Sequence, residues 1–397
     1  MATSAEKMRA WTGPAILSYG FRPFFLGGAV WAAMAMSLWL AALTGAFEIP
    51  TVLDPVSWHA HEFLYGYLGA IVAGFLLTAI PNWTGRMPVA GWQLGGLWAL
   101  WLLGRVAVAT SAAWPPFAVS AIDLAFPLLF AGIIAREIIA GRNWRNLPVV
   151  ALFGILLAGN AIFHWEASVG DFAAQGFGIR IGLAIAIMLI ALIGGRIVPS
   201  FTRNWLVKQG VDRLPAPPMG QFDRVALLFL FAALAVWVAR PDAPVAGVGL
   251  ILAGALHAVR LARWAGFRTG SEPLVWVLHA GYAFIPVGAL VVGISILMPE
   301  IVGTASAQHV WMAGGIGLMT LAVMTRATLG HTGQALTAGA GTTAIYVLLI
   351  IAVVARLLAA GFPQFSEILH IASGLAWLAA FGGFVVLYGR LLVSPRA

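Results

Sequence analysis

Long apolar runs separated by short polar connectors dominate the chain. About twelve of these runs are long enough to cross a membrane as helices, because about 20 apolar residues span the hydrocarbon core of a bilayer. The connectors are polar or rich in proline and glycine, and the longest lies at about 199–221. The pattern predicts an all-α integral membrane protein with about twelve transmembrane helices in a single domain over residues 1–397. The predicted spans are approximately 24–44, 57–80, 92–110, 117–135, 147–166, 178–198, 222–239, 244–262, 273–297, 306–327, 341–358 and 366–390.

The composition agrees with a membrane protein and excludes several kinds of chemistry. Hydrophobic residues make up 61% of the chain and charged residues only 9%, whereas soluble domains carry about 25% charged residues. The lack of cysteine excludes disulfides, thiolate metal ligands, iron–sulfur clusters and covalent haem attachment. The sequence contains no nucleotide-binding loop, serine hydrolase set or zinc protease motif, so neither an ATP-driven pump nor a hydrolase is expected.

The distribution of cations predicts the orientation. If the N-terminus is cytoplasmic, 18 of the 22 Lys and Arg residues fall on the cytoplasmic side, as the positive-inside rule requires. The four exceptions are Arg105, Arg180, Arg240 and Arg356. We therefore expect both termini to be cytoplasmic, with a short cytoplasmic segment at 1–23 and a cytoplasmic loop at about 199–221. The net charge of +8 then reflects these basic regions, and no nucleic-acid partner is expected.

The histidines fall on two levels of this topology. Five lie near the outer ends of their spans: His59, His61, His164, His309 and His370. The remaining three lie toward the inner side: His257, His279 and His331. Imidazole is a good ligand for copper, iron and zinc, so all eight are candidate metal ligands. In the outer group His59, His61, His309 and His370 are the first candidates for metal ligands, and His164 is the next.

Helical spacing limits which of these side chains can act together. Positions two apart point in nearly opposite directions, so His59 and His61 should serve two different partners rather than chelate one ion. Glu62 lies three residues after His59 and should share its face, where a carboxylate can orient a ligating imidazole. The thioether of a methionine beside a histidine would suit Cu(I) or a haem iron. The same spacing pairs Glu367 with His370, Asn160 with His164, and Met312 with His309.

Charged residues within the spans have structural as well as functional interpretations. Arg105 and Asp123 are predicted to pair between adjacent helices and to neutralise each other as part of the scaffold. Toward the inner side, Arg260 shares a face with His257, and Tyr282 with His279, which fits haem or propionate binding as well as snorkelling at the interface. Guanidinium groups suit carboxylates, so three inner arginines are candidates for binding haem propionates: Arg196, Arg203 and Arg326.

A weak internal repeat links the second, sixth and tenth predicted spans. They end in related segments, Pro81–Arg86, Pro199–Asn204 and Met324–Thr328, and they lie four spans apart. A four-helix unit used three times, giving a threefold pseudo-repeat, is one explanation. Chance similarity among glycine-rich membrane helices is the other.

Five segments, in order along nearly the whole chain, form a recognisable set: 20–26 (GFRPFFL), 58–62 (WHAHE), 79–86 (AIPNWTGR), 195–204 (GRIVPSFTRN) and 324–333 (MTRATLGHTG). On these segments the chain resembles the NnrS family of bacterial membrane proteins. The resemblance implies a multi-pass protein of the bacterial inner membrane that contains haem and copper. It also implies an association with denitrification, nitrosative stress and tolerance of nitric oxide, without an established reaction.

The predicted layout is similar to that of haem–copper oxidase main subunits, which have twelve helices in a threefold pseudo-symmetric arrangement. Those subunits also use a His-x-His pair to serve two metal centres on opposite sides of a helix. The likeness is architectural. The sixth, seventh and eleventh predicted spans of this chain contain no histidine, so an oxygen-reducing centre of the oxidase kind is not expected.

The leading hypothesis is a haem and copper protein of the nitric oxide response. It would bind or turn over nitric oxide, or transfer electrons for it from a quinol or another donor, through histidine-ligated metal centres in the lipid bilayer. Two alternatives stay open. A secondary transporter of a metal ion or small substrate would also show about twelve helices, internal repetition and polar groups in the membrane. A nitric oxide sensor would bind the gas without turning it over.

Overall fold

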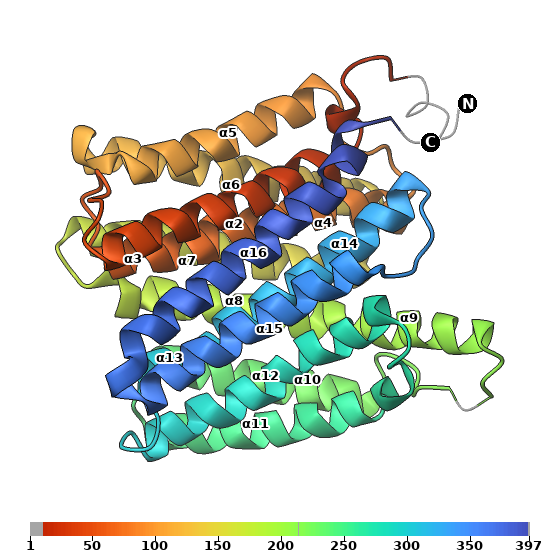
Figure 1. Ribbon diagram of the computed structural model, residues 1–397. Helices are drawn as coiled ribbons and strands as arrows, with labels where there is room; N and C mark the ends of the chain where they lie inside the picture. The colour runs from red at the N-terminus through yellow and green to blue at the C-terminus, as the bar shows by residue number, and fades with distance from the viewer. Residues whose placement is uncertain (1–10, 213, 396–397) are drawn as a thin grey trace. The chain divides into compact units, whose positions relative to one another are not determined.

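The computed structural model describes residues 11–212 and 214–395, which form helices joined by short loops, with no strand among them. Single turns of 3-10 helix occur in the connectors: η1 (Ala15–Leu17), η3 (Ser111–Ala113), η4 (Trp144–Asn146), η5 (Ala173–Gln175), η7 (Gly266–Arg268) and η9 (Pro363–Phe365). The α-helices, drawn in Figure 1, are α2 (Phe21–Leu43), α3 (Pro55–His61), α4 (Leu68–Thr84), α5 (Trp92–Ala109), α6 (Pro116–Ala140), α7 (Leu147–Ser168), α8 (Phe177–Leu189), α9 (Gly195–Lys208), α10 (Gln221–Ala239), α11 (Pro244–Ala262), α12 (Pro273–Leu297), α13 (Thr304–His309), α14 (Met319–Thr332), α15 (Ala340–Gly361) and α16 (Ser366–Val393).

The predicted all-α membrane fold is confirmed. Every predicted span is helical, and within the described residues 11 helices are long and apolar enough to cross a membrane. The predicted span at 92–110 corresponds to α5, which is not one of the 11. This helix is only 18 residues long, and Gln93 and Arg105 lower its mean hydropathy.

Three spans change from α-helical to π-helical winding partway along. The π-helical segments are η2 (Glu62–Tyr67) between α3 and α4, η6 (Ile190–Gly194) between α8 and α9, and η8 (Val310–Leu318) between α13 and α14. Segments of π-helix are rare in proteins, and those that occur are often found at functional sites. They occur in the second, sixth and tenth predicted spans, which are the three that the sequence repeat links. The threefold repeat stays a prediction, and shared π-helical winding is what a repeated unit would produce.

The same three spans are the most buried. Within the apolar window of each, 78% of residues are buried in Pro55–Thr84, 78% in Phe177–Lys208 and 72% in Thr304–Thr332, against 28% to 50% in the other candidate spans. A helix that is buried around most of its circumference belongs to the interior of a bundle. Each of these spans is therefore largely enclosed by protein rather than by lipid.

The chain divides into two compact units by its internal contacts. The first comprises Met1–Gly182, Ala327–Ala335 and Phe381–Ala397. Within it α2 packs on α4, α5 packs on α6, and α6 packs on both α4 and α7 (Figure 1). A line of aromatic rings fills the core between these helices, with centroid distances of 5.6 Å from Phe24 to Phe126, 6.0 Å from Phe126 to Phe130 and 4.9 Å from Phe130 to Phe153.

The second unit comprises Leu183–Arg326 and Leu336–Ala380. Within it α11 packs on α10 and α12, and η8 packs on α12 and α15. Glycines allow α11 and α12 to approach closely: a Cβ atom at Gly293 would lie 2.7 Å from the carbonyl oxygen of Gly247. Small residues at such crossings are typical of membrane helices, whose association depends on tight van der Waals packing. The single domain expected from the sequence stays a prediction.

Local sequence sets where α3 begins and hence where its histidines lie. Asp54 caps the helix, because its Oδ1 accepts hydrogen bonds from the backbone N–H groups of Val56 (3.0 Å) and Ser57 (2.9 Å). Pro55 follows at the first helical position, where its missing N–H costs nothing. His61 is then the last α-helical residue before η2 begins.

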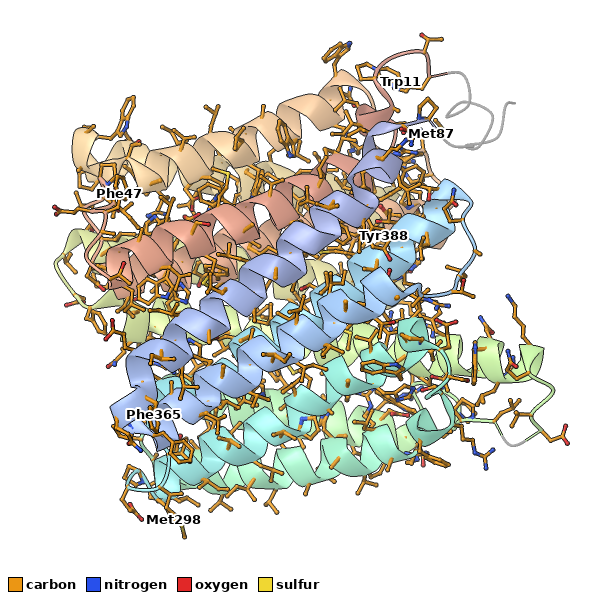
Figure 2. All side chains as sticks on the ribbon, in the orientation of Figure 1. Trp11, Phe47, Met87, Met298, Phe365 and Tyr388 are labelled. Atoms are coloured by element: carbon orange, nitrogen blue, oxygen red, sulfur yellow. The ribbon has the colours of Figure 1, made fainter. Side chains whose placement is uncertain are left out.

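Exposed apolar side chains cover the outer faces of the helices. Phe47, Met87, Met298 and Phe365, labelled in Figure 2, are exposed near helix ends. Others lie along the spans themselves: Leu103, Leu128, Leu228 and Val386. A water-soluble protein does not expose so much apolar surface, whereas a bilayer solvates it. The lipid bilayer is therefore the environment of this chain.

The cytoplasmic location of both termini and of the loop at about 199–221 stays a prediction. The first part of this predicted loop is helical, because α9 continues through Pro199 to Lys208. The π-helical winding just before this proline is one of the adjustments by which membrane helices tolerate the missing N–H. Four of the cations that contribute to the predicted orientation lie outside the described residues: Lys7, Arg9, Arg213 and Arg396.

The close contact between α7 and α8 gives a test of the packing. A Cβ atom at Gly178 would lie 2.5 Å from the backbone nitrogen of Phe163, and backbone cannot move aside as a side chain can. Gly178→Ala should therefore destabilise the protein by about 1–3 kcal/mol, the usual cost of overpacking. Thermal unfolding of the purified protein in detergent measures the change. Gly154→Ala is the matched control, because nothing lies within 4 Å of a Cβ atom there. Equal stability of the two variants would contradict the packing.

Candidate metal centre

Five helical segments of the first unit bring polar side chains together in the interior. Each segment is apolar for most of its length, so a polar contribution from every one is costly unless the groups satisfy one another. Asn160 and His164 are four residues apart in α7 and therefore share a face. We call the set the first polar cluster; it consists of His61 of α3, Glu62 of η2, Arg105 of α5, Asp123 of α6, and Asn160 and His164 of α7.

Arg105 connects two carboxylates at the centre of the cluster. Its Nη1 donates to both carboxylate oxygens of Glu62, at 2.8 Å each, and its Nη2 donates to Oδ1 of Asp123. The exposed fractions of Arg105, Glu62 and Asp123 are 3%, 0% and 2%. The predicted pairing of Arg105 with Asp123 is thus confirmed, and Glu62 joins it. An ion pair this deeply buried is favourable only when further hydrogen bonds satisfy the remaining atoms.

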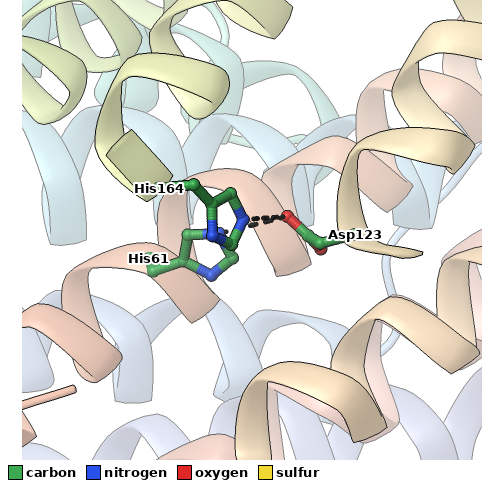
Figure 3. A group of neighbouring side chains, drawn as sticks. All are labelled: His61, Asp123 and His164. Carbon is green, nitrogen blue, oxygen red and sulfur yellow. Dashed lines mark hydrogen bonds and ion pairs between the residues drawn. The ribbon is translucent and has the colours of Figure 1, made fainter. Parts of the chain in front are cut away.

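The histidines of the cluster face the second oxygen of Asp123. The Nε2 atom of His164 lies 3.0 Å from Oδ2 of Asp123, and the Nε2 atom of His61 lies 3.3 Å from the same oxygen. Asn160 donates to this oxygen as well, at 2.8 Å. One ligand atom from each of His61, Asp123 and His164 lies within 4.8 Å of the others. Figure 3 shows both imidazoles turned toward the aspartate carboxylate. These three side chains could hold one metal ion.

Both ring nitrogens of His61 face hydrogen-bond acceptors, so His61 needs either a second proton or a bound cation. Its Nδ1 lies 2.9 Å from Oε1 of Glu62, and its Nε2 lies 3.0 Å from Oδ1 of Asn160. Carboxylate and amide oxygens only accept hydrogen bonds, so each ring nitrogen must carry a proton or face a metal ion. The two carboxylates and one guanidinium of the cluster sum to one negative charge. A single proton on His61 or a bound cation compensates for it.

A small cavity lies against the cluster. Its lining includes Tyr65, Arg105, Asp123, Phe153 and Asn160, and it has room for about one water molecule. The Nε atom of Arg105 is buried without a hydrogen-bond partner, and a water in this cavity would be a suitable one. A haem needs several hundred cubic ångströms. The cluster therefore fits a metal ion and does not fit a haem.

The other outer histidines lie elsewhere. The ring of His59 stacks on Trp39 (centroids 4.4 Å apart) and contacts Phe63, so the prediction that His59 and His61 serve different surroundings is confirmed. His309 hydrogen-bonds through Nδ1 with the carbonyl oxygen of Ala305 at 2.6 Å. His370 lies near enough to His309 to interact with it electrostatically, as does Arg356. Of these outer histidines, the structure thus brings His61 and His164 into direct contact.

The inner histidines have different neighbours. His257 and His279 belong to the second unit, where Nδ1 of His257 lies 2.8 Å from the Tyr282 hydroxyl and Nε2 of His279 lies 2.7 Å from the Thr202 hydroxyl. His331 belongs to the first unit and stacks on Tyr19 with centroids 5.6 Å apart. A role of these three in metal or haem ligation stays a prediction.

Among the predicted orienting residues, Glu62 and Asn160 lie in the first polar cluster. Helical spacing pairs Glu62 with His59, but in the structure the Glu62 carboxylate hydrogen-bonds with the adjacent His61. The π-helical winding begins at Glu62, whose carboxylate also faces Arg105. Glu367 is exposed, and Ser366 rather than Glu367 contacts His370 (3.2 Å). Met312 is half-buried in η8.

The three arginines predicted to bind propionates lie in α9 and α14. Arg203 is exposed, Arg196 is half-buried, and the guanidinium of Arg326 lies over the ring of Phe201, 4.1 Å from its centroid. This last contact is a cation–π interaction. Propionate binding by these residues stays a prediction.

The sequence reasoning missed Asp123 as a candidate ligand, because it assigned this residue to the scaffold. The signal was present: an ionisable residue in an apolar span is a functional candidate by default. What the sequence could not supply was the contact between α6 and α7, which places the Asp123 carboxylate against His164.

The fold and the cluster together define a polytopic helical membrane protein with a buried histidine–aspartate group that could hold a metal ion. The family model described as NnrS protein matches residues 15–396. The match covers nearly the whole chain, so the chain belongs to the NnrS family, as the sequence segments predicted. No curated protein matches the sequence.

The central role of Arg105 can be tested by stability. Arg105→Met leaves the Glu62 and Asp123 carboxylates buried without their cation, which should cost about 3–5 kcal/mol. Arg86→Met is the matched control: Arg86 also pairs with a carboxylate, that of Glu137, but its side chain is 42% exposed. That pair should contribute about 1 kcal/mol or less. Chemical unfolding in detergent compares the two variants. A loss at Arg105 no larger than that at Arg86 would refute the assignment.

Proposed function

We propose that this NnrS-family protein holds a copper ion at His61, Asp123 and His164 and acts in the nitric oxide response. It binds or turns over nitric oxide, or transfers electrons for that purpose. The single observation that carries the proposal is the buried group of three ligand atoms within 4.8 Å of one another. The family resemblance supplies the link to nitric oxide and to copper, and the site supplies ligands for the metal.

The donor set supports copper. Imidazole nitrogens suit copper, iron, nickel and zinc, and the chain contains no cysteine that could offer a softer ligand. Copper would supply a centre that exchanges one electron and binds nitric oxide. The surrounding helices keep bulk water away, since His61 and Asp123 are buried. Electrostatic interactions are stronger in such a medium than in water.

The residues of the cluster have distinct roles in this proposal. Glu62 accepts the Nδ1–H of His61, which fixes the tautomer and directs an unprotonated Nε2 toward Asp123. Asn160 donates to Asp123 and holds its carboxylate in place. Arg105 pairs with both carboxylates and holds them in place. The metal replaces the proton that otherwise compensates for the negative charge of the cluster.

Haem ligation has less support at His257 and His279 of the second unit. Both ring nitrogens of His257 are engaged, by Tyr282 and by the carbonyl oxygen of Ala226. The Nδ1 side of His279 packs against Gly266, where even a Cβ atom would collide with the ring, and its Nε2 is engaged by Thr202. In this arrangement neither histidine fits an iron ligand, and the proposal assigns no haem to them.

A second candidate function is proton-coupled transport. The observation that favours it is the position of His61 between acceptor groups, which suits a proton as well as a metal ion. A protein that binds no copper, but whose proton-coupled uptake into proteoliposomes is lost in His61→Ala, would support transport over the copper proposal. A sensor differs from both in binding nitric oxide without forming a product.

Metal content tests the proposed site. Protein purified from copper-supplemented cells should contain about one copper ion per chain at this site, bound by three protein ligands. His61→Ala and His164→Ala should each lose most of it, because two ligands hold an ion far less tightly than three. His331→Ala is the matched control, since His331 contacts Tyr19 and Phe21 instead. Mass spectrometry of the metal gives the stoichiometry. Unchanged copper in both cluster variants would exclude the site.

The reaction half of the proposal needs a separate measurement. Copper-loaded protein in lipid nanodiscs, mixed with nitric oxide under anaerobic reducing conditions, should bind or consume the gas, and the His164→Ala protein should not. Copper that is bound but does not respond to nitric oxide would leave the metal site standing and overturn the function.

The orienting role of Glu62 leads to a quantitative expectation. Glu62→Gln keeps the shape of the side chain but removes the charge that holds His61 and Arg105. Copper affinity should fall by about 10- to 100-fold, as is usual when a group that orients a ligand is changed. Competition with a copper chelator measures the affinity. An affinity equal to that of the unaltered protein would show that Glu62 does not position His61.

A further inference from the structure

A second buried polar cluster lies entirely within the second unit and has no role in the proposed copper site. It consists of Asp223 of α10, His257 and Arg260 of α11, and Tyr282 of α12. All four side chains are buried, and His257, Arg260 and Tyr282 are completely so. A phenol, an imidazole and an ion pair gathered in an apolar interior are costly to place there, so each needs a defined partner.

The directions of the hydrogen bonds in this cluster are fixed by chemistry. Arg260 can only donate, so its Nη1 donates to the hydroxyl oxygen of Tyr282 at 2.8 Å. The Tyr282 hydroxyl lies 2.8 Å from Nδ1 of His257, and its own proton goes to this nitrogen when the imidazole carries its proton on Nε2 alone. The Nε2–H of His257 donates to the carbonyl oxygen of Ala226 at 3.2 Å. A neutral His257 with its proton on Nε2 presents Nδ1 as the acceptor of the phenolic proton, and this arrangement satisfies the hydroxyl and both ring nitrogens.

The charged pair beside Tyr282 is locked in place. The Nε atom of Arg260 donates to Oδ1 of Asp223 at 2.7 Å, and its Nη1 also donates to the carbonyl oxygen of Ala191 in η6 at 2.9 Å. Gly195 packs against the guanidinium so closely that a Cβ atom there would collide with it. Arg260 and Asp223 cancel each other's charge, so the buried ion pair adds no net charge beside the Tyr282 hydroxyl.

We propose that Tyr282 is a redox-active tyrosine that is oxidised by one electron with His257 as its proton acceptor. The proposal does not depend on the copper site, because its residues all belong to the second unit. A phenol can be oxidised at moderate potential only if its proton leaves with the electron. The 2.8 Å contact with an unprotonated imidazole nitrogen provides the acceptor for that proton.

The step is balanced as follows. A one-electron oxidant, of the class of an oxidised metal centre, takes one electron from Tyr282 and is itself reduced by one electron. The phenolic O–H bond breaks, and the proton forms an N–H bond at Nδ1 of His257. The products are a neutral tyrosyl radical and an imidazolium, which keeps its Nε2–H bond to Ala226. Return of one electron to the radical moves the proton back to the phenolic oxygen.

An aromatic neighbour offers a route for the electron. The indole of Trp264 packs edge-on against Tyr282, with ring centroids 4.6 Å apart. Trp264 follows α11 directly and leads into η7, whose Phe267 is 80% exposed. Trp264, itself only 1% exposed, is thus placed to pass an electron to or from the buried phenol.

The surroundings of other buried tyrosines show what a purely structural hydroxyl requires. Tyr65 donates to the carbonyl oxygen of Gly178 at 2.6 Å, and the hydroxyl of Tyr346 hydrogen-bonds with that of Thr325. Carbonyl and hydroxyl oxygens satisfy a phenol but are too weakly basic to take its proton. Tyr282 is hydrogen-bonded to a base as well as to a cation, which is more than burial alone demands.

The test is photochemical oxidation of the purified full-length protein. A ruthenium polypyridyl complex with an irreversible electron acceptor generates a strong one-electron oxidant under a laser flash, and electron paramagnetic resonance detects the tyrosyl radical. His257→Gln keeps a hydrogen-bonding side chain but removes the base. Radical formation at Tyr282 should then slow by about 100-fold, the low end of what a positioned base contributes. Tyr282→Phe should lose this radical.

Tyr346→Phe is the matched control, because it also removes a buried phenol that is hydrogen-bonded to a neutral hydroxyl. It should leave the radical yield unchanged. The proposal is overturned if the signal survives in Tyr282→Phe, if it is lost in Tyr346→Phe, or if His257→Gln forms the radical as fast as the unaltered protein.

A measurement on the unaltered protein keeps the proposal testable if the variants do not fold. Protein labelled with ¹⁵N-histidine should give a tyrosyl radical whose pulsed magnetic resonance spectrum shows coupling to a histidine nitrogen. A tyrosyl radical without this coupling, or no tyrosyl radical at all, would rule out His257 as the proton acceptor.

Discussion

The buried guanidinium of Arg105 is the constraint on which the first unit depends. A cation with 3% exposure inside an apolar bundle requires anions, and Glu62 and Asp123 supply them. Those anions in turn hydrogen-bond with His61, Asn160 and His164, whose polar atoms would otherwise be unsatisfied. Once Arg105 is in place, the helices that carry its partners have little freedom to rotate or slide. The proposed metal ligands are therefore held in position by the hydrogen bonds of the cluster itself.

The two polar clusters share a plan. In each, an arginine pairs with an aspartate on an adjacent helix: Arg105 with Asp123 between α5 and α6, and Arg260 with Asp223 between α11 and α10. Each arginine also reaches a π-helical segment, at Glu62 in η2 and at the Ala191 carbonyl in η6. A wider helical turn leaves backbone and side-chain acceptors available that a regular helix would use internally. The same plan in two places is what a repeated helical unit would produce.

Much of the fold could be predicted from the sequence, because the length of an apolar run is set by the thickness of the bilayer. The pairing of Arg105 with Asp123 was also predictable, since two opposite charges in neighbouring spans have few other solutions. The partners of Glu62 and His164 were not. Helical spacing assigned Glu62 to His59, but π-helical winding begins at Glu62, and single-sequence patterns do not reveal it. Asp123 and His164 meet because α6 packs on α7, and periodicity gives the faces of helices but not their neighbours.

The central claim is that His61 and His164 bind the same copper ion. Pulsed electron paramagnetic resonance of the Cu(II)-loaded protein tests it most directly, because the unpaired electron couples to the nitrogens of each coordinated imidazole. The account predicts coupling to two histidines, and its loss when His61 and His164 are replaced together. A Cu(II) spectrum without imidazole coupling, or one that persists unchanged in the double variant, would contradict it.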